Sequence, residues 1–215
     1  MVKLKILACA YRRWAFELLE GFYHDILIVT KPKDLERKYN AFMPHIVLLL
    51  GWSWKVPEKI YKSVPTICLH PSPLPLYRGG SPLQHQIMDG KKEGAVTYFI
   101  VDDGIDSGPI LAQTKLSLEG NIKDIFARMV IAGRQLLRTI IEQYPDFKTY
   151  PQEGKSTFYK RRTPEQSQLT RLDFYNKSAE ELYNFIRALG DPYPNAFIIC
   201  GDGRKIYFKE VSLGA

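Results

Sequence analysis

The chain has few cysteines and no long apolar run, which argues against a disulfide-rich secreted protein and against a membrane-spanning protein. Its 215 residues include three cysteines, Cys9, Cys68 and Cys200, which lie far apart and have neither metal-ligand spacing nor the pattern of a disulfide framework. No apolar run approaches the roughly 18 residues that span a bilayer. A basic turn at 11–13 interrupts the apolar start of the chain, so 1–14 predicts a first strand and not a signal peptide. We therefore expect a cytoplasmic protein without a membrane segment or a bound metal.

The chain also lacks a tract in which basic and aromatic residues alternate. Lys and Arg exceed Asp and Glu by 30 to 23, which gives a formal net charge of +7. The basic residues are dispersed, and their tightest cluster is 160–162. A groove for a polynucleotide usually needs a denser pattern. The charge therefore favours a small molecule that carries a nucleotide as the partner, ahead of nucleic acid.

Apolar runs alternate with amphipathic segments, which predicts a doubly wound, mostly parallel, Rossmann-like α/β sheet. The expected strands are 3–10, 26–29, 46–50, 66–69, 95–101 and 110–116, and the expected helices are 13–21, 34–42, 57–62, 81–89 and 121–144. We assign 1–150 to this domain. The remainder, 151–215, is expected to be a small α+β C-terminal extension, too short to fold alone, with an irregular 151–164, a helix at 178–189 and a hairpin turning at 201–203.

Two residues with acid–base chemistry lie in loops after expected strands. His70 stands in a proline-rich turn, and Asp106 closes an acidic, glycine-flanked loop. Because ligands bind at the carboxyl ends of strands in doubly wound sheets, both side chains are expected on one rim. Imidazole titrates near neutrality and a carboxylate can tune it, so the pair suits proton transfer. Taken alone, the pair is also compatible with two ordinary loops.

The wider pattern is more specific. It comprises HPSPLPLYRGG at 70–80, GAVT at 94–97 and DDGIDSGPI at 102–110. This ordered set resembles the folate-dependent formyltransferases. The resemblance implies transfer of a formyl group from 10-formyltetrahydrofolate to an amine by a catalytic Asn, His and Asp. His70 would serve as oxyanion donor and proton shuttle, and Asp106 would orient it and accept the proton.

Cys68 occupies the position of the family asparagine, two residues before His70. A thiol is a weaker donor than a carboxamide, and loss of one oxyanion donor typically costs about 100- to 1000-fold in turnover. Three interpretations remain open. Water or His70 takes over the role, or the protein is a slow or inactive binder, or a Cys68 thiolate beside an imidazolium carries the formyl group as a thioester.

The resemblance also implies a folate pocket between the loop after the third strand and the acidic loop. Its candidate residues are Trp52, Ser53, Trp54, Lys55, Val56, Leu74, Val101, Asp102, Asp103 and Gly104. An apolar wall with backbone donors suits a flat heterocycle that has polar edges. Without the resemblance, the tryptophan-rich loop would be read as a hydrophobic plug at a sheet edge.

The acceptor is predicted from weaker signals. The basic turn after the first strand precedes a helix, where backbone amides and the helix dipole favour phosphate. A second basic segment, 78–84, follows the His70 turn and suits a sugar or a diphosphate. The candidate acceptor residues are Tyr11, Arg12, Arg13, Arg78, Gly79 and Gln84. Solvated surface is an equally acceptable reading of both arginine clusters.

The C-terminal segment 156–197 resembles the extension shared by methionyl-tRNA formyltransferases and nucleotide-sugar N-formyltransferases. Only one hairpin is evident after it, whereas the tRNA enzymes continue into a complete barrel, and the stretch 30–43 is short for the family. We therefore expect a homodimeric nucleotide-linked amino-sugar N-formyltransferase of surface-polysaccharide (lipopolysaccharide or O-antigen) synthesis. The alternatives are a formyltransferase acting on aminoacyl-tRNA or another amine, and a folate or sugar-nucleotide binder whose Cys68 marks lost catalysis.

Overall fold

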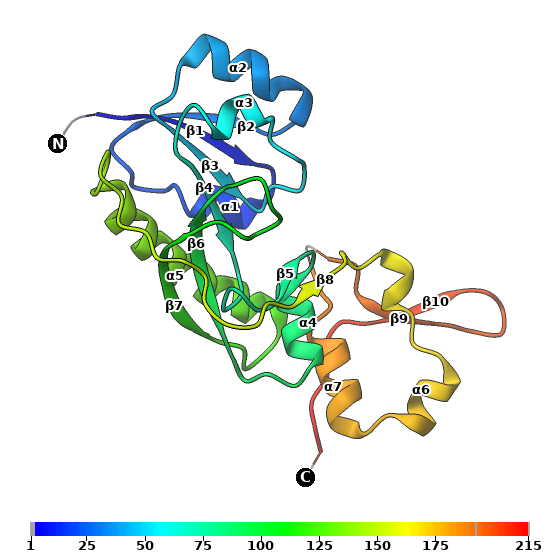
Figure 1. Cartoon of the computed structure of the whole chain (residues 1–215). Coiled ribbons are helices and arrows are strands. Elements are labelled where there is room, and N and C mark those ends of the chain that lie inside the picture. Colours follow the sequence, from blue (N-terminus) through cyan, green and yellow to red (C-terminus); the bar gives the residue numbers. More distant parts are fainter. Residues whose placement is uncertain (1–2, 192, 215) are drawn as a thin grey trace.

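The centre of the molecule is a six-stranded sheet in the order β2-β1-β3-β4-β6-β7 (Figure 1). A computed structural model describes residues 3–191 and 193–214. The described residues do not include Met1, Val2, Pro192 and Ala215, which belong to segments discussed in the sequence analysis. The strands are β1 (Lys5–Ala10), β2 (Asp25–Val29), β3 (Ile46–Leu50), β4 (Thr66–His70), β6 (Glu93–Ile100) and β7 (Ile110–Ser117). The first four pair in parallel, and β6 runs antiparallel to its two neighbours. The predicted mostly parallel α/β class is confirmed.

Helices cover both faces of this sheet (Figure 1). They are α1 (Arg13–Glu17) and α5 (Ile122–Ile141) on one face, and α2 (Leu35–Phe42), preceded by the 3-10 turn η1 (Pro32–Asp34), with α3 (Glu58–Tyr61) on the other. Strand residues alternate between the two faces, as a period of two requires. In β1, Ile6 and Ala8 join the cluster beneath α5, whereas Leu7 and Cys9 join the cluster beneath α2 and α3.

Local signals explain where the helices begin and end. Asn121 caps α5, because its side chain accepts from the backbone of Asp124 while Asp124 bonds back to the Asn121 backbone. The predicted helix 13–21 is shorter than expected, since the chain passes from α1 into turns that end at Gly21 in a left-handed conformation (φ 76°). Helix α4 (Pro82–Met88) lies within the predicted 81–89.

The expectation that His70 and the acidic loop both follow strands onto the same rim of the sheet is wrong, because β6 runs antiparallel to β4. Ile100, at the end of β6, pairs with Ile67 near the start of β4, and Thr97 pairs with His70. The loop 101–109 therefore leaves the sheet near the start of β4, at the opposite end of that strand from His70. It reaches His70 only by folding back over the face of the sheet that carries α3.

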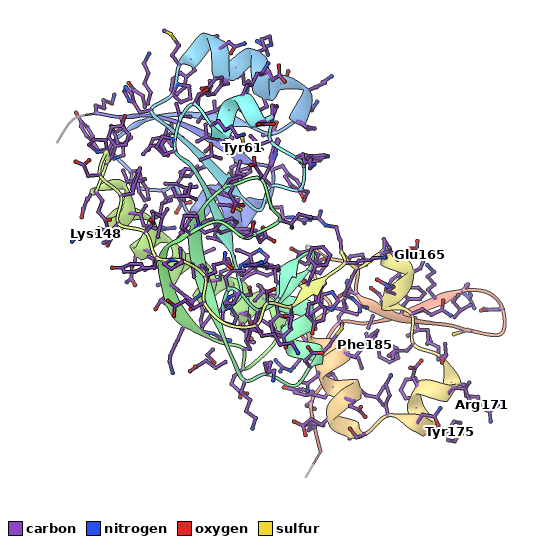
Figure 2. The ribbon with its side chains drawn as sticks, viewed as in Figure 1. Tyr61, Lys148, Glu165, Arg171, Tyr175 and Phe185 are labelled. Atoms are coloured by element: carbon purple, nitrogen blue, oxygen red, sulfur yellow. The ribbon has the colours of Figure 1, made fainter. Side chains whose placement is uncertain are left out.

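The C-terminal extension returns to the His70 turn before it forms its own elements. Strand β8 (Phe158–Tyr159) pairs in parallel with β5 (Arg78–Gly79), beside which it lies in Figure 1. The later elements are η2 (Pro164–Ser167), α6 (Arg171–Asn176), α7 (Ala179–Arg187) and the antiparallel hairpin of β9 (Ala196–Ile199) with β10 (Lys205–Phe208). The predicted irregular segment thus contains β8, and α6 was not predicted. Figure 2 places Arg171 and Tyr175 of α6 at the outer end of this extension, away from the central sheet.

Candidate active site

His70 is the last residue of β4 and is 5% exposed. Its Nε2 lies 2.8 Å from the carbonyl oxygen of Tyr77, and its Nδ1 lies 3.5 Å from Asp106 Oδ2. A carbonyl can only accept a hydrogen bond, so Nε2 carries a hydrogen in the tautomer that these partners imply. Nδ1 is therefore the ring atom that can exchange a proton next to the carboxylate.

Asp106 is held at both its backbone and its carboxylate. Its φ is 51°, in the left-handed region, and its Oδ2 accepts from the backbone N–H of Gly79 at 2.8 Å. The loop before it is closed by Asp102, whose Oδ1 accepts from the Gly104 N–H at 3.1 Å and from the Ser107 hydroxyl at 2.8 Å. This loop brings Asp106 to His70, although His70 ends β4 and the loop begins near the other end of that strand.

Tyr77 supplies the carbonyl that binds His70; it belongs to the motif at 70–80, but the sequence did not mark it as a site residue. Its hydroxyl donates to Asp89 Oδ2 at 2.9 Å, and its ring stacks on Tyr159 at 5.0 Å between centroids. The Tyr159 hydroxyl donates to the same Asp89 oxygen at 3.1 Å. Burial, and after it the Asp89 carboxylate, raises the pKa of Tyr77, so its hydroxyl remains a donor at neutral pH. Tyr159 of β8 and Asp89, the residue directly after α4, thus support the turn that holds His70.

Cys68 lies on the same face of β4 as His70, where it packs against the apolar cluster beneath α2 and α3. Burial raises the pKa of its thiol well above the usual value, and the Asp106 carboxylate adds to that rise. Its S–H points to the Leu69 carbonyl at 3.6 Å. The environment therefore favours the neutral thiol, which is the opposite of what a thiolate nucleophile beside an imidazolium requires.

The tryptophan loop after β3 forms an aromatic cluster with Tyr11. The ring of Trp54 lies 4.8 Å from that of Trp52 and 4.9 Å from that of Tyr11, and the Tyr11 hydroxyl bonds to Ser53 Oγ at 2.6 Å. The indole nitrogen of Trp52 is buried and has no hydrogen-bond partner among the residues that the structure describes. Lys55 is exposed. Tyr11, predicted to contact the acceptor, thus lies with the residues predicted to hold the cofactor.

Some of the remaining cofactor candidates pack in the apolar interior, and others lie in the exposed part of the acidic loop. Val56 and Val101 pack against the same apolar cluster as Cys68, and Leu74 is buried. Asp103 points to α3, where it accepts from the hydroxyl of Tyr61 at 3.0 Å (Tyr61 is labelled in Figure 2). An apolar and aromatic wall with one unpartnered indole donor fits a flat heterocycle that has polar edges. These residues therefore fit the pteridine of a folate.

The acceptor candidates are only partly brought together. The Arg12 guanidinium stacks between the rings of Tyr11 and Tyr193, 5.0 and 4.7 Å from their centroids. Burial raises the pKa of Tyr193 while the charges of Arg12 and Arg161 oppose the rise, which is consistent with both guanidinium groups lying near this ring. Gln84 is buried in α4.

The structure does not place Arg13 with the other acceptor candidates, and it does not provide the expected phosphate site at the N-terminus of α1. Arg13 points to solvent beside Glu17, at 3.5 Å, and away from this group. Helix α1 has five residues, and the Arg12 side chain makes no capping bond, so the expected phosphate site at a helix N-terminus lacks a proper helix. The Arg78 guanidinium donates to Gln152 Oε1 at 2.7 Å.

Two cavities involve the C-terminal extension, and neither is lined by His70 or Asp106. One, of about 190 Å³, lies between η2 and the hairpin. The other, of about 420 Å³, lies where α7 and residues 211–213 meet Gly90, Lys92 and Glu119 of the first domain. Among residues 3–191 and 193–214, no group of three or more His, Cys, Asp and Glu is placed to hold a metal ion. Within the same ranges, no helix has the length and apolar character needed to cross a membrane.

Sequence profiles of one family match both parts of the chain. The profile described as formyl transferase matches residues 29–129, and that of the formyl transferase C-terminal domain matches 165–214. The chain belongs to the formyl transferase family. The methionyl-tRNA formyltransferase of Clostridium beijerinckii is 29% identical over 89% of this chain and 65% of its own length, and that of Lactococcus lactis subsp. cremoris is 34% identical over 66% and 45%. The chain thus spans about half to two thirds of these curated relatives.

Several solved structures are similar along almost the whole of this chain. A methionyl-tRNA formyltransferase from Clostridium thermocellum has a TM-score of 0.87 at 29% identity, covering 98% of this chain and 94% of that one. A sugar N-formyltransferase from Shewanella has a TM-score of 0.77 at 14% identity, with 99% of each chain covered. HypX from Aquifex aeolicus, solved with tetrahydrofolic acid, has a TM-score of 0.80 at 18% identity over 97% of this chain and 38% of its own. The last two likenesses concern the fold alone.

Proposed function

We propose that this formyl transferase moves a formyl group from 10-formyltetrahydrofolate to the amino group of a nucleotide-linked amino-sugar. The observation that carries the reaction is the His70–Asp106 pair, with Nδ1 and Oδ2 3.5 Å apart and His70 almost fully buried. Attack of an amine on a formyl carbonyl creates an oxyanion and an excess proton on nitrogen. A site for this reaction therefore needs a base and donors at one place.

Each residue of the pair has a distinct task in this proposal. His70 receives the proton at Nδ1, because Nε2 is occupied by the Tyr77 carbonyl. Asp106 holds the imidazole in that orientation and stabilises the charge that it gains. When bound, the folate supplies the formyl group; Trp52, Trp54 and Val101 would hold its pteridine. Cys68 contributes no covalent step, since its thiol stays protonated.

The acceptor proposal rests on the group around Arg12. A cation between two aromatic rings offers a charge for a diphosphate and planar surfaces for a base. An aminoacyl-tRNA is the second candidate, favoured by the methionyl-tRNA formyltransferases among the relatives. Both candidates carry an amine near a phosphate chain, so a direct comparison is needed.

A formylation assay tests these candidates together. The protein is incubated with 10-formyltetrahydrofolate and, in separate reactions, with UDP-, dTDP- and GDP-linked amino-sugars, initiator methionyl-tRNA and simple amines. We expect turnover with one nucleotide sugar. Turnover with the tRNA alone would replace the acceptor, and binding without turnover for every acceptor would identify a folate or sugar-nucleotide binder.

We further propose that the protein acts in the cytoplasm as a homodimer and supplies formylated sugars for surface polysaccharide. The support for a dimer is apolar surface on the C-terminal hairpin, where Ile199, Ile206 and Tyr207 are exposed. Sedimentation velocity at several concentrations tests it. A monomer at all concentrations would rule the dimer out.

A further inference from the structure

Gln152, which the sequence did not single out, uses all four hydrogen-bonding positions of its amide, the two acceptor lone pairs of its oxygen and the two donors of its nitrogen. Its Oε1 accepts from Arg78 Nε at 3.2 Å and from Arg78 Nη2 at 2.7 Å. Its Nε2 donates to the carbonyl of Asp106 at 2.9 Å and to that of Gly108 at 2.8 Å. One side chain from the C-terminal extension thus joins β5 to the loop that carries Asp106.

The amide has a defined orientation. Arg78 has only donors, so it binds the oxygen end of Gln152 and directs the nitrogen end to the loop. The Asp106 and Gly108 carbonyls have only acceptors, so they require that nitrogen end. Reversing the amide would place donor against donor and acceptor against acceptor at all four contacts.

The backbone around Gln152 is anchored on both sides. Tyr150 exchanges two backbone hydrogen bonds with Ile110, at 2.7 and 2.8 Å, directly after the acidic loop. Beyond it, the Thr157 carbonyl accepts from the Arg78 N–H at 2.9 Å. A side chain between two such anchors has little freedom to follow the loop if the loop moves.

We infer that Gln152 is a positioning residue for the His70–Asp106 pair. It holds the left-handed backbone of Asp106 through the carbonyl, while Gly79 of β5 holds the carboxylate, and the Arg78 contact joins these two supports. Together they place Oδ2 at His70 Nδ1. The inference rests on the proposed function for its effect on turnover, but its effect on His70 does not need a substrate.

Two substitutions separate this role from that of a simple partner for Arg78. Gln152→Glu keeps an acceptor for Arg78 but removes both donors to the loop. Gln152→Met, with a side chain of similar volume, removes the acceptor for Arg78 and both donors to the loop. We expect each to lower kcat by about 100-fold, the scale of a misplacement of about 1 Å, with KM values within a few-fold of wild type. Gln135→Glu, the same chemical change on the exposed face of α5, should leave kcat unchanged. Wild-type kcat in Gln152→Glu together with a loss in Gln152→Met would overturn the inference.

A second measurement needs no folate and no acceptor. The chain has four histidines, so the imidazole ¹⁵N signals of His70 can be assigned with a His70→Asn variant. In Gln152→Glu and Gln152→Met we expect the Nδ1 signal to move as it does in Asp106→Asn, and to stay in place in Gln135→Glu. An Nδ1 signal unchanged in both Gln152 variants would refute the positioning role. If wild-type protein formylates no acceptor, the proposed function fails, while this spectrum still decides the role of Gln152.

Discussion

At the residue scale, the partners of one imidazole decide what it can do. The Tyr77 carbonyl occupies Nε2 of His70, and the Asp106 carboxylate faces Nδ1. A change at either neighbour therefore acts on the same imidazole, at Nε2 or at Nδ1. Tyr77 itself depends on Asp89 and Tyr159, so the orientation of His70 is set by residues from three segments of the chain.

We predict that His70→Asn and Asp106→Asn each lower kcat by about 100-fold or more, because each removes a member of the proton-handling pair. Steady-state formylation kinetics measure the loss, and circular dichroism checks that the fold is intact. Asp146→Asn, an exposed change of the same kind, should have no effect. Near-wild-type kcat in a folded variant would remove that residue from the mechanism.

Cys68 gives a second prediction. Burial raises the pKa of the Cys68 thiol well above its usual value and raises that of Cys9 to about 12. Both thiols are therefore expected to stay protonated at pH 8. Cys68 and Cys200 are both partly exposed, and because the Cys68 thiol stays protonated we expect iodoacetamide to label Cys200 before Cys68. Cys68→Ser should retain most activity, and Cys68→Asn should raise it by supplying a stronger donor. Intact-protein mass spectrometry with folate and no acceptor is the deciding measurement. An adduct about 28 Da heavier on Cys68, as covalent catalysis would give, would contradict this prediction.

The sequence was informative about residues that belong to a recognisable motif. His70 and Asp106 could be selected because they lie in the ordered set of motifs within 70–110, which resembles one family. Taken alone, the pair was also compatible with two ordinary loops. Gln152 and Tyr159 could not be selected, because their significance comes from contacts with residues 44 or more positions away. Glutamine and tyrosine occur in many extensions without such a role, and no spacing distinguishes these two.

At the scale of elements, the two-residue pairing of β5 with β8 connects the extension to the site. Gly79 has φ 94°, and a Cβ there would lie 2.2 Å from the Tyr159 carbonyl oxygen. Any side chain at this position therefore pushes β8 away. The same displacement would disturb the Gly79 N–H that binds Asp106.

We predict that Gly79→Ala destabilises the protein more than Gly154→Ala does. Gly154 has a similar φ of 92° but nothing within 4 Å of its Cβ position, so it shares the backbone strain without the clash. The additional loss for Gly79→Ala should be about 1–3 kcal/mol, the usual cost of overpacking, measured by urea unfolding. Equal losses would show that β8 yields without cost.

Most of the elements found by sequence have a buried face; the exposed strand β10 could be predicted because the Gly-Asp-Gly turn at 201–203 marks its hairpin. Strands such as β3 are apolar throughout and could be located to the residue. Helix α6 has no buried residue and β8 has two residues, so neither leaves a periodic pattern. The direction of β6 also could not be predicted, because a run of buried residues does not specify whether its neighbour runs parallel or antiparallel.

At the scale of the whole molecule, the positive charge bears on the choice of acceptor. The net charge of +7 attracts both candidate acceptors, so charge alone does not separate them. We propose that the group around Arg12 favours the nucleotide sugar, since the Arg12 guanidinium lies over the rings of Tyr11 and Tyr193, with Arg161 near the second ring. Ligand-induced stabilisation can therefore distinguish the two.

We predict that the matching nucleoside diphosphate sugar raises the melting temperature, and that initiator tRNA does not at moderate salt. At about 100 times its Kd the ligand should add roughly 2.7 kcal/mol of stability. Arg12→Ala should reduce this shift, whereas Arg204→Ala, at the exposed hairpin turn, should preserve it. A shift with tRNA alone that survives moderate salt would overturn the sugar reading.

The order of elements along the chain has a consequence during synthesis. Every strand of the central sheet precedes residue 118, whereas Gln152 and β8 follow the twenty-residue helix α5. Since domains fold from the N-terminus as they leave the ribosome, the sheet can form while the chain is still growing. The His70–Asp106 pair receives its last hydrogen bonds only when residues 152–159 emerge, so a nascent chain halted before them would carry a folded sheet with an unassembled site.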